Sequence, residues 1–234
     1  MEIERIPRLI DVSCVKAEST LEDIEKMVYA AKHFRFVCAF ALPGFTRTLV
    51  EKLSDCSDIM VGGVVGFPAG GDTTAVKVAG ARDMIAAGVN ELDMVINVGA
   101  LKSAQYDMVY KDIRAVVDAA EGLPVKCILE IAHLTDDEIC RGAELAVKAG
   151  VTYVKTGTGW ASKPTTVDTI RLIKKTIGDA AKIKAAGGVR SLDTLLEMEK
   201  CGCSRFGIGT TSAISILKEA YARCGTPWDF EEKL

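Results

Sequence analysis

Short apolar runs rich in β-branched residues alternate along the chain with longer segments that have the spacing of amphipathic helices. The apolar runs lie at 8–13, 35–41, 60–67, 91–98, 125–131, 151–156, 181–187 and 204–210. Runs of this length are typical of strands buried on both faces, as in a parallel sheet. The pattern therefore predicts eight strands, each followed by a helix.

The segments between the runs have the end signals of capped helices. In "LTDDE" (134–138) and "SLDTLLE" (191–197), a Thr or Ser is followed by acidic residues in the next turn. A hydroxyl accepts a hydrogen bond from a free backbone N–H there, and the acids favour the positive end of the helix dipole. Several of these segments also end close to a glycine. Helices are therefore predicted between the strands.

The strand–helix alternation favours a closed α/β barrel, the TIM (β/α)8 fold. No change of composition divides the chain, so residues 1–234 are predicted to form a single domain with a short tail from about residue 225. The alternative is an open, doubly wound sheet. Such a sheet commonly has a Gly-rich fingerprint after its first strand, whereas this chain reads "IDVSCVKAEST" at 10–20.

The charge balance argues against polyanionic partners. The net charge is −3 and the pI is about 5.6, which predicts no binding to nucleic acid or to an anionic membrane surface. No apolar stretch is long enough to cross a bilayer, and the first residues do not resemble a signal peptide. A cytoplasmic location is therefore expected.

The cysteines and histidines are poorly placed for a metal site. Of eight cysteines, only Cys201 and Cys203 lie close together in the sequence, so we interpret all eight as reduced thiols. His33 and His133 are the only histidines, which excludes a three-histidine site. No metal and no cofactor are expected, and lysines and carboxylates are left as the candidates for chemistry.

Five charged residues interrupt the predicted strands. Asp11 is expected to end the first strand, Asp93 lies in the fourth, Lys126 begins the fifth, Lys155 ends the sixth and Lys184 lies in the seventh. Alternation along each strand can direct these side chains into the barrel, whose active sites lie at the C-terminal ends of the strands. The alternative is a buried ion-pair network that only stabilises the barrel.

Glycine-rich segments follow the last three predicted strands: "TGTGW" (156–160), "AGGVR" (186–190) and "GIGTTS" (207–212). Glycines let backbone N–H groups approach an anion closely, and the next helix adds its dipole. Phosphate sites of these barrels follow strands seven and eight. The segments therefore predict a phosphate site, with tight turns that need glycine for geometry alone as the alternative.

Two lysines near one another suggest imine chemistry. A neutral amine can attack a carbonyl group, but free lysine has a pKa of about 10.4 and is protonated at pH 7. A second ammonium about 4 Å away supplies ~4 kcal/mol, enough to lower that pKa by roughly three units. Lys155 is thus predicted to be the nucleophile, Lys184 the neighbour that keeps it neutral, and Asp93 a proton relay.

The same segments resemble 2-deoxyribose-5-phosphate aldolase, a class I aldolase family with a TIM barrel. The resemblance extends from "LIDVS" to "GIGTTS" and is strongest in "VVGFPAG", "NELDMVINVGALKS", "VKCILE", "YVKTGTGW" and "IKAAGGVRSLDTLLEM". It implies reversible cleavage of 2-deoxy-D-ribose 5-phosphate to D-glyceraldehyde 3-phosphate and acetaldehyde, without a metal. The implied partners are sugar phosphates and short aldehydes, and the implied assembly is a monomer or a homodimer.

The resemblance also implies roles for individual residues. Lys155 is similar to the Schiff-base lysine of the family, Lys184 to the lysine that perturbs it, and Asp93 to its proton-relay aspartate. Asp11 and Lys126 match polar residues around the same site. The residues that fall at the family's phosphate site are Gly159, Gly187, Gly188, Gly209, Thr211 and Ser212.

The chain departs from the family pattern at three places. Val12 replaces a histidine, Leu42 stands where a polar residue is common, and the segment 207–212 is longer than the usual Gly-Thr-Ser-Ser. We expect these changes to lie near the acceptor aldehyde. They leave open two alternatives: a class I aldolase or sugar-phosphate enzyme with a different aldehyde, and a non-catalytic barrel that binds a sugar phosphate.

Overall fold

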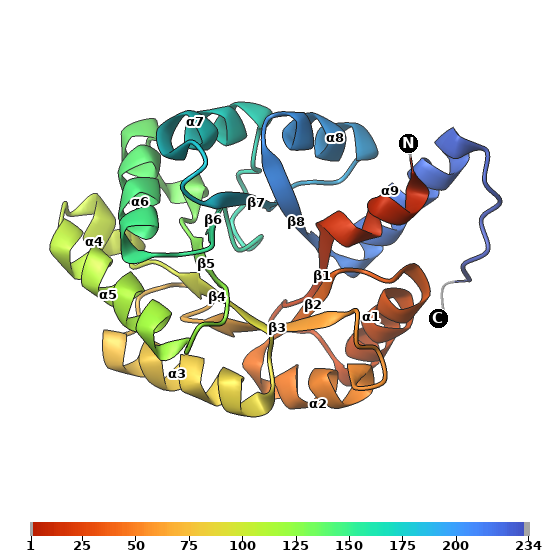
Figure 1. Cartoon of the computed structure of the whole chain (residues 1–234), viewed down its shortest axis with the longest axis horizontal. Helices are drawn as coiled ribbons and strands as arrows, with labels where there is room; N and C mark the ends of the chain where they lie inside the picture. Colours follow the sequence, from red (N-terminus) through yellow and green to blue (C-terminus); the bar gives the residue numbers. More distant parts are fainter. Residues whose placement is uncertain (1, 232–234) are drawn as a thin grey trace.

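The computed structural model describes residues 2–231 and is a closed barrel of eight parallel strands (Figure 1). Each strand pairs with the next one along the chain, and the last pairs with the first. The predicted TIM barrel and its single-domain architecture are therefore confirmed. The strands are β1 (Ile10–Cys14), β2 (Cys38–Ala41), β3 (Met60–Val65), β4 (Glu91–Val95), β5 (Val125–Ile128), β6 (Tyr153–Lys155), β7 (Lys182–Ala186) and β8 (Cys203–Gly209).

Helices surround the barrel and separate its strands from solvent (Figure 1). They are α1 (Leu21–Phe34), α2 (Pro43–Leu53), α3 (Thr74–Ala87), α4 (Val98–Lys102), α5 (Tyr106–Ala119), α6 (Asp136–Ala149), α7 (Val167–Ile177), α8 (Leu192–Lys200) and α9 (Thr210–Cys224). Three short 3-10 segments complete the set: η1 (Ile3–Arg5), η2 (Pro7–Leu9) and η3 (Ile131–His133).

The predicted helix starts are formed by the expected hydrogen bonds. Thr135 and Glu138 form a capping box at α6, in which each side chain accepts from the other residue's backbone N–H. At α8, the Ser191 hydroxyl accepts from the N–H of Thr194. Hydroxyl caps of this kind contribute about 1 kcal/mol each.

Except for β8, the strands are shorter than the apolar runs that predicted them. The run 91–98, for example, gives a strand only over Glu91–Val95, because Asn97 caps α4 directly after it. Asp11 is the second residue of β1, so the expectation that it ends this strand is wrong. Short strands keep the barrel shallow, which places the charged residues within reach of the loops above them.

The apolar core has two parts of very different size. The larger part fills the space between strands and helices and includes Val12, Met94, Val154 and Ala185. The smaller part lies inside the barrel around Phe40 and Val64. Most of the remaining interior is charged, whereas the interior of a TIM barrel is usually filled by branched aliphatic residues. This unusual interior is the main sign of a functional site.

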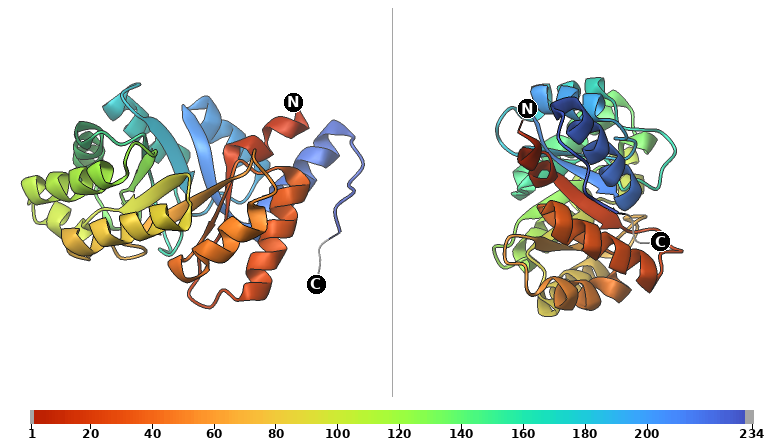
Figure 2. Two further views of the ribbon diagram at one scale, coloured as in Figure 1. Left: turned by 60° about the horizontal axis from the view of Figure 1, so that its bottom comes forward. Right: turned by 90° about the vertical axis from the view of Figure 1, so that its right-hand side faces the viewer.

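The C-terminal tail lies at the pole of the barrel opposite the loops that follow the strands. Residues after α9 form no helix or strand up to residue 231. The ring centroid of Phe230 lies 5.0 Å from that of His33 and 4.7 Å from that of Phe34. Both partners are at the C-terminal end of α1. The N-terminal 3-10 segments lie beside α9 in the views of Figure 2.

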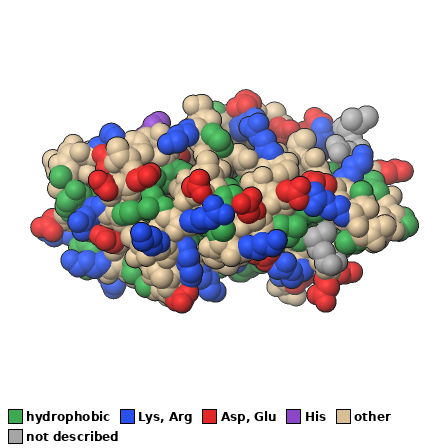
Figure 3. All heavy atoms as spheres, turned by 90° about the horizontal axis from the view of Figure 1, so that it is seen from above, with side chains coloured by type: hydrophobic (Ala, Val, Ile, Leu, Met, Phe, Trp, Pro, Cys, Tyr) green, Lys and Arg blue, Asp and Glu red, His purple; other side chains and the backbone are tan. Residues whose placement is uncertain are grey.

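The surface is evenly charged on the face in Figure 3, where Lys and Arg alternate with Asp and Glu. A mixed surface of this kind has no basic stripe to follow a nucleic acid backbone. Within residues 2–231, no helix combines the length and the apolar character needed to span a bilayer.

Candidate active site

The strand register directs the predicted lysines and Asp93 into the interior of the barrel. Lys155 on β6 is paired with Lys184 on β7, and Asp93 on β4 is paired with Lys126 on β5. Paired residues of neighbouring parallel strands face the same way, and all four side chains are buried inside the barrel. The register therefore forms a cluster from residues that lie far apart in the sequence.

Asp93 is the centre of this cluster. Its Oδ2 accepts hydrogen bonds from Lys155 Nζ and Lys184 Nζ, each at 2.7 Å. Its Oδ1 accepts from Lys126 Nζ at 3.1 Å. One carboxylate thus holds two of the ammonium groups on a single oxygen atom, which fixes Lys155 and Lys184 beside each other.

A second layer of charge lies below, towards the N-terminal ends of the strands. Arg205 Nη1 contacts Asp11 Oδ1 at 2.6 Å, and Lys184 Nζ contacts Asp11 Oδ2 at 2.6 Å. Lys126 forms an ion pair with Glu91. The cluster therefore contains four basic side chains against three carboxylates. These charges balance when one of the four basic groups is neutral.

The Phe40 ring covers the ammonium groups from the β2 side. Its centroid is 4.3 Å from Lys184 Nζ, 5.1 Å from Lys126 Nζ and 5.9 Å from Lys155 Nζ. The face of an aromatic ring attracts a cation and excludes water. Gly62 makes room for this ring, because a Cβ at residue 62 would lie 2.1 Å from the Phe40 ζ carbon.

Lys155 is the one basic residue of this cluster whose pKa is lowered. Burial lowers the pKa of Lys155 to about 8; the carboxylate of Asp93 opposes this, and the charge of Lys184 adds to it. Burial raises the cost of the charged form, and the side chain keeps only 8% of its surface exposed. Lys155 is thus the member of the cluster that releases its proton most easily near neutral pH.

Its neighbours remain ionised. Burial by itself lowers the pKa of Lys184, but the charges of Asp11 and Asp93 outweigh it and the pKa is raised. Burial would likewise raise the pKa of Asp93, but the charges of Lys126, Lys155 and Lys184 hold it well below its usual range. The sequence argument gave the charge of Lys184 as sufficient to lower the pKa of Lys155, with desolvation acting in the same direction; in the structure both lower it, and burial is the larger cause.

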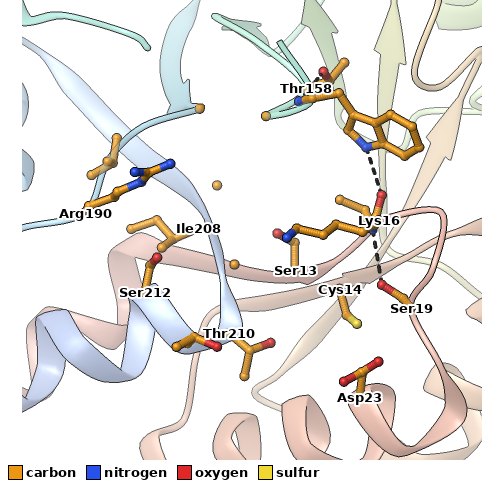
Figure 4. A pocket seen from close by; sticks show the side chains of 18 of the residues that line it. Ser13, Cys14, Lys16, Ser19, Asp23, Thr158, Arg190, Ile208, Thr210 and Ser212 are labelled. Atoms are coloured by element: carbon orange, nitrogen blue, oxygen red, sulfur yellow. Dashed lines mark hydrogen bonds between the residues drawn. The ribbon is translucent and has the colours of Figure 1, made fainter. Parts of the chain in front are cut away.

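Two cavities open above the cluster. A small inner cavity of about 30 Å³ is lined by Lys155, Lys184 and Phe40, with Ser13 and Thr158 at its upper edge. A wide outer cavity of about 510 Å³ lies at the mouth of the barrel, between the loops after β1, β6, β7 and β8 (Figure 4). Ser13 and Thr158 line both, so the two cavities adjoin.

All six residues predicted at the phosphate site line the outer cavity. They are Gly159, Gly187, Gly188, Gly209, Thr211 and Ser212. Gly209 begins α9 without a side-chain cap, so the first N–H groups of this helix face the cavity unpaired by a side chain. At Gly188, φ is +86° and a Cβ would lie 2.4 Å from Pro164, so no other residue fits there.

A chain of hydrogen bonds holds the loop after β6. The buried carboxylate of Glu130 accepts from the N–H of Thr158 at 3.2 Å and from its hydroxyl. The Thr158 hydroxyl in turn accepts from the N–H of Trp160 at 3.0 Å. The indole of Trp160 then donates to Val15 O at 2.9 Å, as Figure 4 shows with a dashed line. The chain joins the loop after β6 to the loop after β1 across the mouth.

Two of the departures from the family pattern lie away from both cavities. Val12 is fully buried and packs in the outer core between the barrel and the helices, because the neighbours Asp11 and Ser13 are the residues of β1 that face inwards. Leu42 is the residue before α2 and lines neither cavity. The expectation that these two residues lie at the acceptor is therefore wrong. The segment 207–212 does line the outer cavity.

One set of possible metal ligands lies in the cluster, but basic side chains already neutralise it. Ligand atoms of Asp11, Cys38 and Glu91 lie within 4.8 Å of one another. Lys126 contacts Glu91, and Arg205 contacts Asp11. These basic side chains neutralise the two carboxylates, as a bound metal ion otherwise would.

Sequence reasoning missed four residues of the site: Glu91, Arg205, Phe40 and Glu130. Period-two alternation could have found the first two, since Glu91 is two residues before Asp93 and Arg205 is two residues before Gly207. Glu130 lay inside the predicted run 125–131, but it follows β5 with a left-handed φ of +56°. No local pattern marks Phe40, whose role comes from the lysines of other strands.

Comparison with known proteins places this site in a family. Residues 10–207 match the family model described as "DeoC/LacD family aldolase". A protein of Sinorhizobium medicae named deoxyribose-phosphate aldolase is 44% identical over 225 residues, which cover 96% of this chain and 91% of that protein.

Solved structures agree with this match. A crystal structure of a putative deoxyribose-phosphate aldolase from Coccidioides immitis has a TM-score of 0.89 at 31% identity and covers 94% of this chain and 87% of that one. The tetrameric deoxyribose phosphate aldolase of Aeropyrum pernix has a TM-score of 0.84 at 28% identity. The match covers 95% of this chain and 93% of that one. With its barrel, its paired lysines and these relatives, the chain belongs to the DeoC/LacD family of class I aldolases.

Proposed function

We propose that this protein is a deoxyribose-phosphate aldolase, which reversibly cleaves 2-deoxy-D-ribose 5-phosphate to D-glyceraldehyde 3-phosphate and acetaldehyde. The observation that carries the proposal is the buried amine of Lys155, whose pKa of about 8 leaves neutral amine available at physiological pH. At pH 7 a lysine with this pKa has about 200-fold more neutral amine than an ordinary lysine. This availability of neutral amine supports Lys155 as the proposed nucleophile.

The proposed reaction proceeds through an imine between Lys155 and the substrate. The amine of Lys155 attacks C1 of the open-chain sugar, and loss of water gives an imine to the lysine. A base then removes the proton of the C3 hydroxyl and the C2–C3 bond breaks, with the bonding pair drawn towards the imine. Asp93, hydrogen-bonded to Lys155, is proposed to relay these protons through water. Protonation of C2 and hydrolysis release acetaldehyde.

The two cavities suggest how the substrate lies. The inner cavity beside Lys155 is narrow and bordered by Phe40 and Val64, which suits the two-carbon acetaldehyde part. The outer cavity is proposed to hold the phosphate on Gly159, Gly187, Gly188, Gly209, Thr211 and Ser212. Binding energy from this distant group would orient the reacting carbons. Neither the reaction nor the binding of substrate requires a metal or a cofactor in this scheme.

Assembly and location stay predictions. A homodimer is proposed from the resemblance, while the Aeropyrum pernix relative is described as a tetramer. Size-exclusion chromatography with light scattering decides between them. A cytoplasmic location is supported by the cysteines, since Cys38, Cys127 and Cys203 are buried thiols outside any disulfide.

The proposal is tested by reductive trapping. The protein and a Lys155→Ala variant are incubated with acetaldehyde and sodium borohydride, and intact masses are measured. One ethyl group on the wild-type chain, absent from the variant, is expected. No adduct on folded wild-type protein would remove the Schiff-base mechanism and favour a barrel that only binds a sugar phosphate. An adduct without cleavage of 2-deoxyribose 5-phosphate would favour a class I aldolase for another aldehyde.

A further inference from the structure

Two basic side chains face each other across the outer cavity. Lys16 extends into it from the loop between β1 and α1, and Arg190 extends from the opposite wall, after β7 (Figure 4). Within residues 2–231, neither side chain makes an ion pair or a side-chain hydrogen bond to the protein; only the backbone N–H of Lys16 donates, to the Ser19 hydroxyl. Elsewhere in the described chain, other basic residues such as Arg82, Lys111 and Lys175 are also unpaired, but Lys16 and Arg190 differ from them because they line one cavity together.

The other charged residues at the cavity wall differ from them. Lys26 is paired with Glu22 at 2.9 Å on the exposed side of α1. Asp23 accepts from the N–H of Thr20 at 2.8 Å and is part of the capping box of α1. Glu18 lines the cavity near Lys16. Its carboxylate repels an anion, so any anion bound here needs more than one cation.

A phosphate monoester is the ligand that this arrangement fits. It carries a charge of −1.5 to −2 at pH 7 and has three acceptor oxygens. The unpaired N–H groups at the start of α9 and the hydroxyls of Thr210, Thr211 and Ser212 supply donors but no full charge. Arg190 alone neutralises one negative charge, and Lys16 supplies the second.

We propose that Lys16 is a phosphate-binding residue, which makes the site selective for aldehydes with a terminal phosphomonoester dianion. This inference rests on the proposed function and extends it to a residue outside the glycine-rich loops. Lys16 is exposed, so its attraction for the dianion acts through water and is screened by salt. The Trp160–Val15 hydrogen bond fixes the residue next to Lys16 and so positions its side chain.

The test compares two substrates. Lys16→Gln is expected to raise the KM for 2-deoxyribose 5-phosphate about 10-fold, as loss of one charge-assisted contact does, with kcat nearly unchanged. Its kcat/KM for unphosphorylated 2-deoxyribose stays at the wild-type value. Lys16→Arg keeps the charge and is expected to retain a low KM. Lys52→Gln is the matched control, since Lys52 on α2 pairs with Glu25 at 2.8 Å and lines neither cavity, and it leaves both substrates unaffected.

Salt provides a second readout. The KM of the wild type for the phosphorylated substrate is expected to rise with NaCl, and that of Lys16→Gln is expected to rise less steeply. An equal loss on both substrates, or an equal salt dependence of both proteins, would show that Lys16 only shapes the loop, and the proposal would be overturned.

A binding measurement separates this proposal from the proposed function. In a Trp228→Phe background, Trp160 is the remaining tryptophan and lies in the outer cavity. Its fluorescence is titrated with inorganic phosphate. A weaker affinity in Lys16→Gln supports the phosphate role even if 2-deoxyribose 5-phosphate is not cleaved. Identical affinities, or no binding by the wild type, would refute it whatever the enzyme's substrate.

Discussion

The ammonium nitrogen of Lys184 lies 4.3 Å from the centre of the Phe40 ring and 2.7 Å from Asp93 Oδ2. Lys184 is thus held between an aromatic face and a carboxylate, inside a barrel that excludes water. Both contacts favour its charged form. Lys184 also pairs with Asp11 at 2.6 Å, a contact that Lys155 lacks, so the pKa of Lys184 is raised whereas burial lowers the pKa of Lys155 to about 8.

The first prediction concerns pH. Because the pKa of Lys155 is about 8, the rate of reductive trapping with acetaldehyde is expected to rise with pH and level off above pH 8. Below that pH the rate falls about tenfold per unit, since the neutral fraction does. The measurement is the initial rate of adduct formation by mass spectrometry between pH 6 and 9.5. A midpoint near 10.5 would show that Lys155 is an ordinary lysine.

Asp93→Asn is expected to lower the pH at which the rate of reductive trapping is half-maximal. The charge of Asp93 raises the pKa of Lys155, so its removal leaves burial and the charge of Lys184 to lower the pKa further. Cleavage activity is expected to fall by about 10²–10⁴-fold through loss of the proposed proton relay.

The same variant tests stability. Removing one partner of a buried ion pair costs about 3–5 kcal/mol. Urea unfolding of Asp93→Asn should therefore show a much lower midpoint than that of the wild type. A normal unfolding midpoint together with an unchanged trapping midpoint would contradict the central position of Asp93.

Gly62→Ala is expected to damage the site through Phe40. The new methyl group would lie 2.1 Å from the ring, so the ring must move away from the lysines. Overpacking of this kind costs about 1–3 kcal/mol, and entry of water is expected to raise the pKa of Lys155. The control is Gly71→Ala, where a Cβ meets open space. Thermal unfolding and the pH profile of trapping are measured for both; equal behaviour of the two variants would argue against the role of the ring.

Glu130→Gln tests the hydrogen-bond chain across the mouth. The neutral amide loses the charge-assisted contacts to Thr158, so the loop after β6 is expected to move. The KM for 2-deoxyribose 5-phosphate should rise about 10-fold, while trapping of acetaldehyde at Lys155 continues at the wild-type rate. A loss of trapping instead of binding would place Glu130 in the chemistry.

Lys77 allows a test of stability away from the site. It donates to Val95 O at 2.9 Å and forms a buried ion pair with Asp112 at 2.5 Å, which joins α3 to α5. Lys77→Met leaves Asp112 buried without a cation and is expected to cost about 3–5 kcal/mol. The double variant Lys77→Met/Asp112→Leu should recover most of this loss. Urea unfolding measures both, and kcat per folded molecule should not change.

The sequence was sufficient to predict the barrel because each strand–helix unit carries its own signals. Apolar runs, caps such as Thr135 and end glycines are all local. The lysines and Asp93 could be predicted as a cluster, since alternation directs them inwards. The pairing of Lys184 with Asp11 could not, because it depends on the register between strands at opposite ends of the chain. Burial, which sets the pKa of Lys155, is likewise a property of the closed barrel.

The unequal number of charges in the barrel has a consequence for the course of the reaction. With three carboxylates against Lys126, Lys184 and Arg205, the interior is electroneutral only when the nitrogen of Lys155 is uncharged. The free amine and the enamine meet this condition, and the ammonium and the protonated iminium do not. We therefore expect the barrel to favour the enamine, the carbon nucleophile that joins two aldehydes in the synthetic direction.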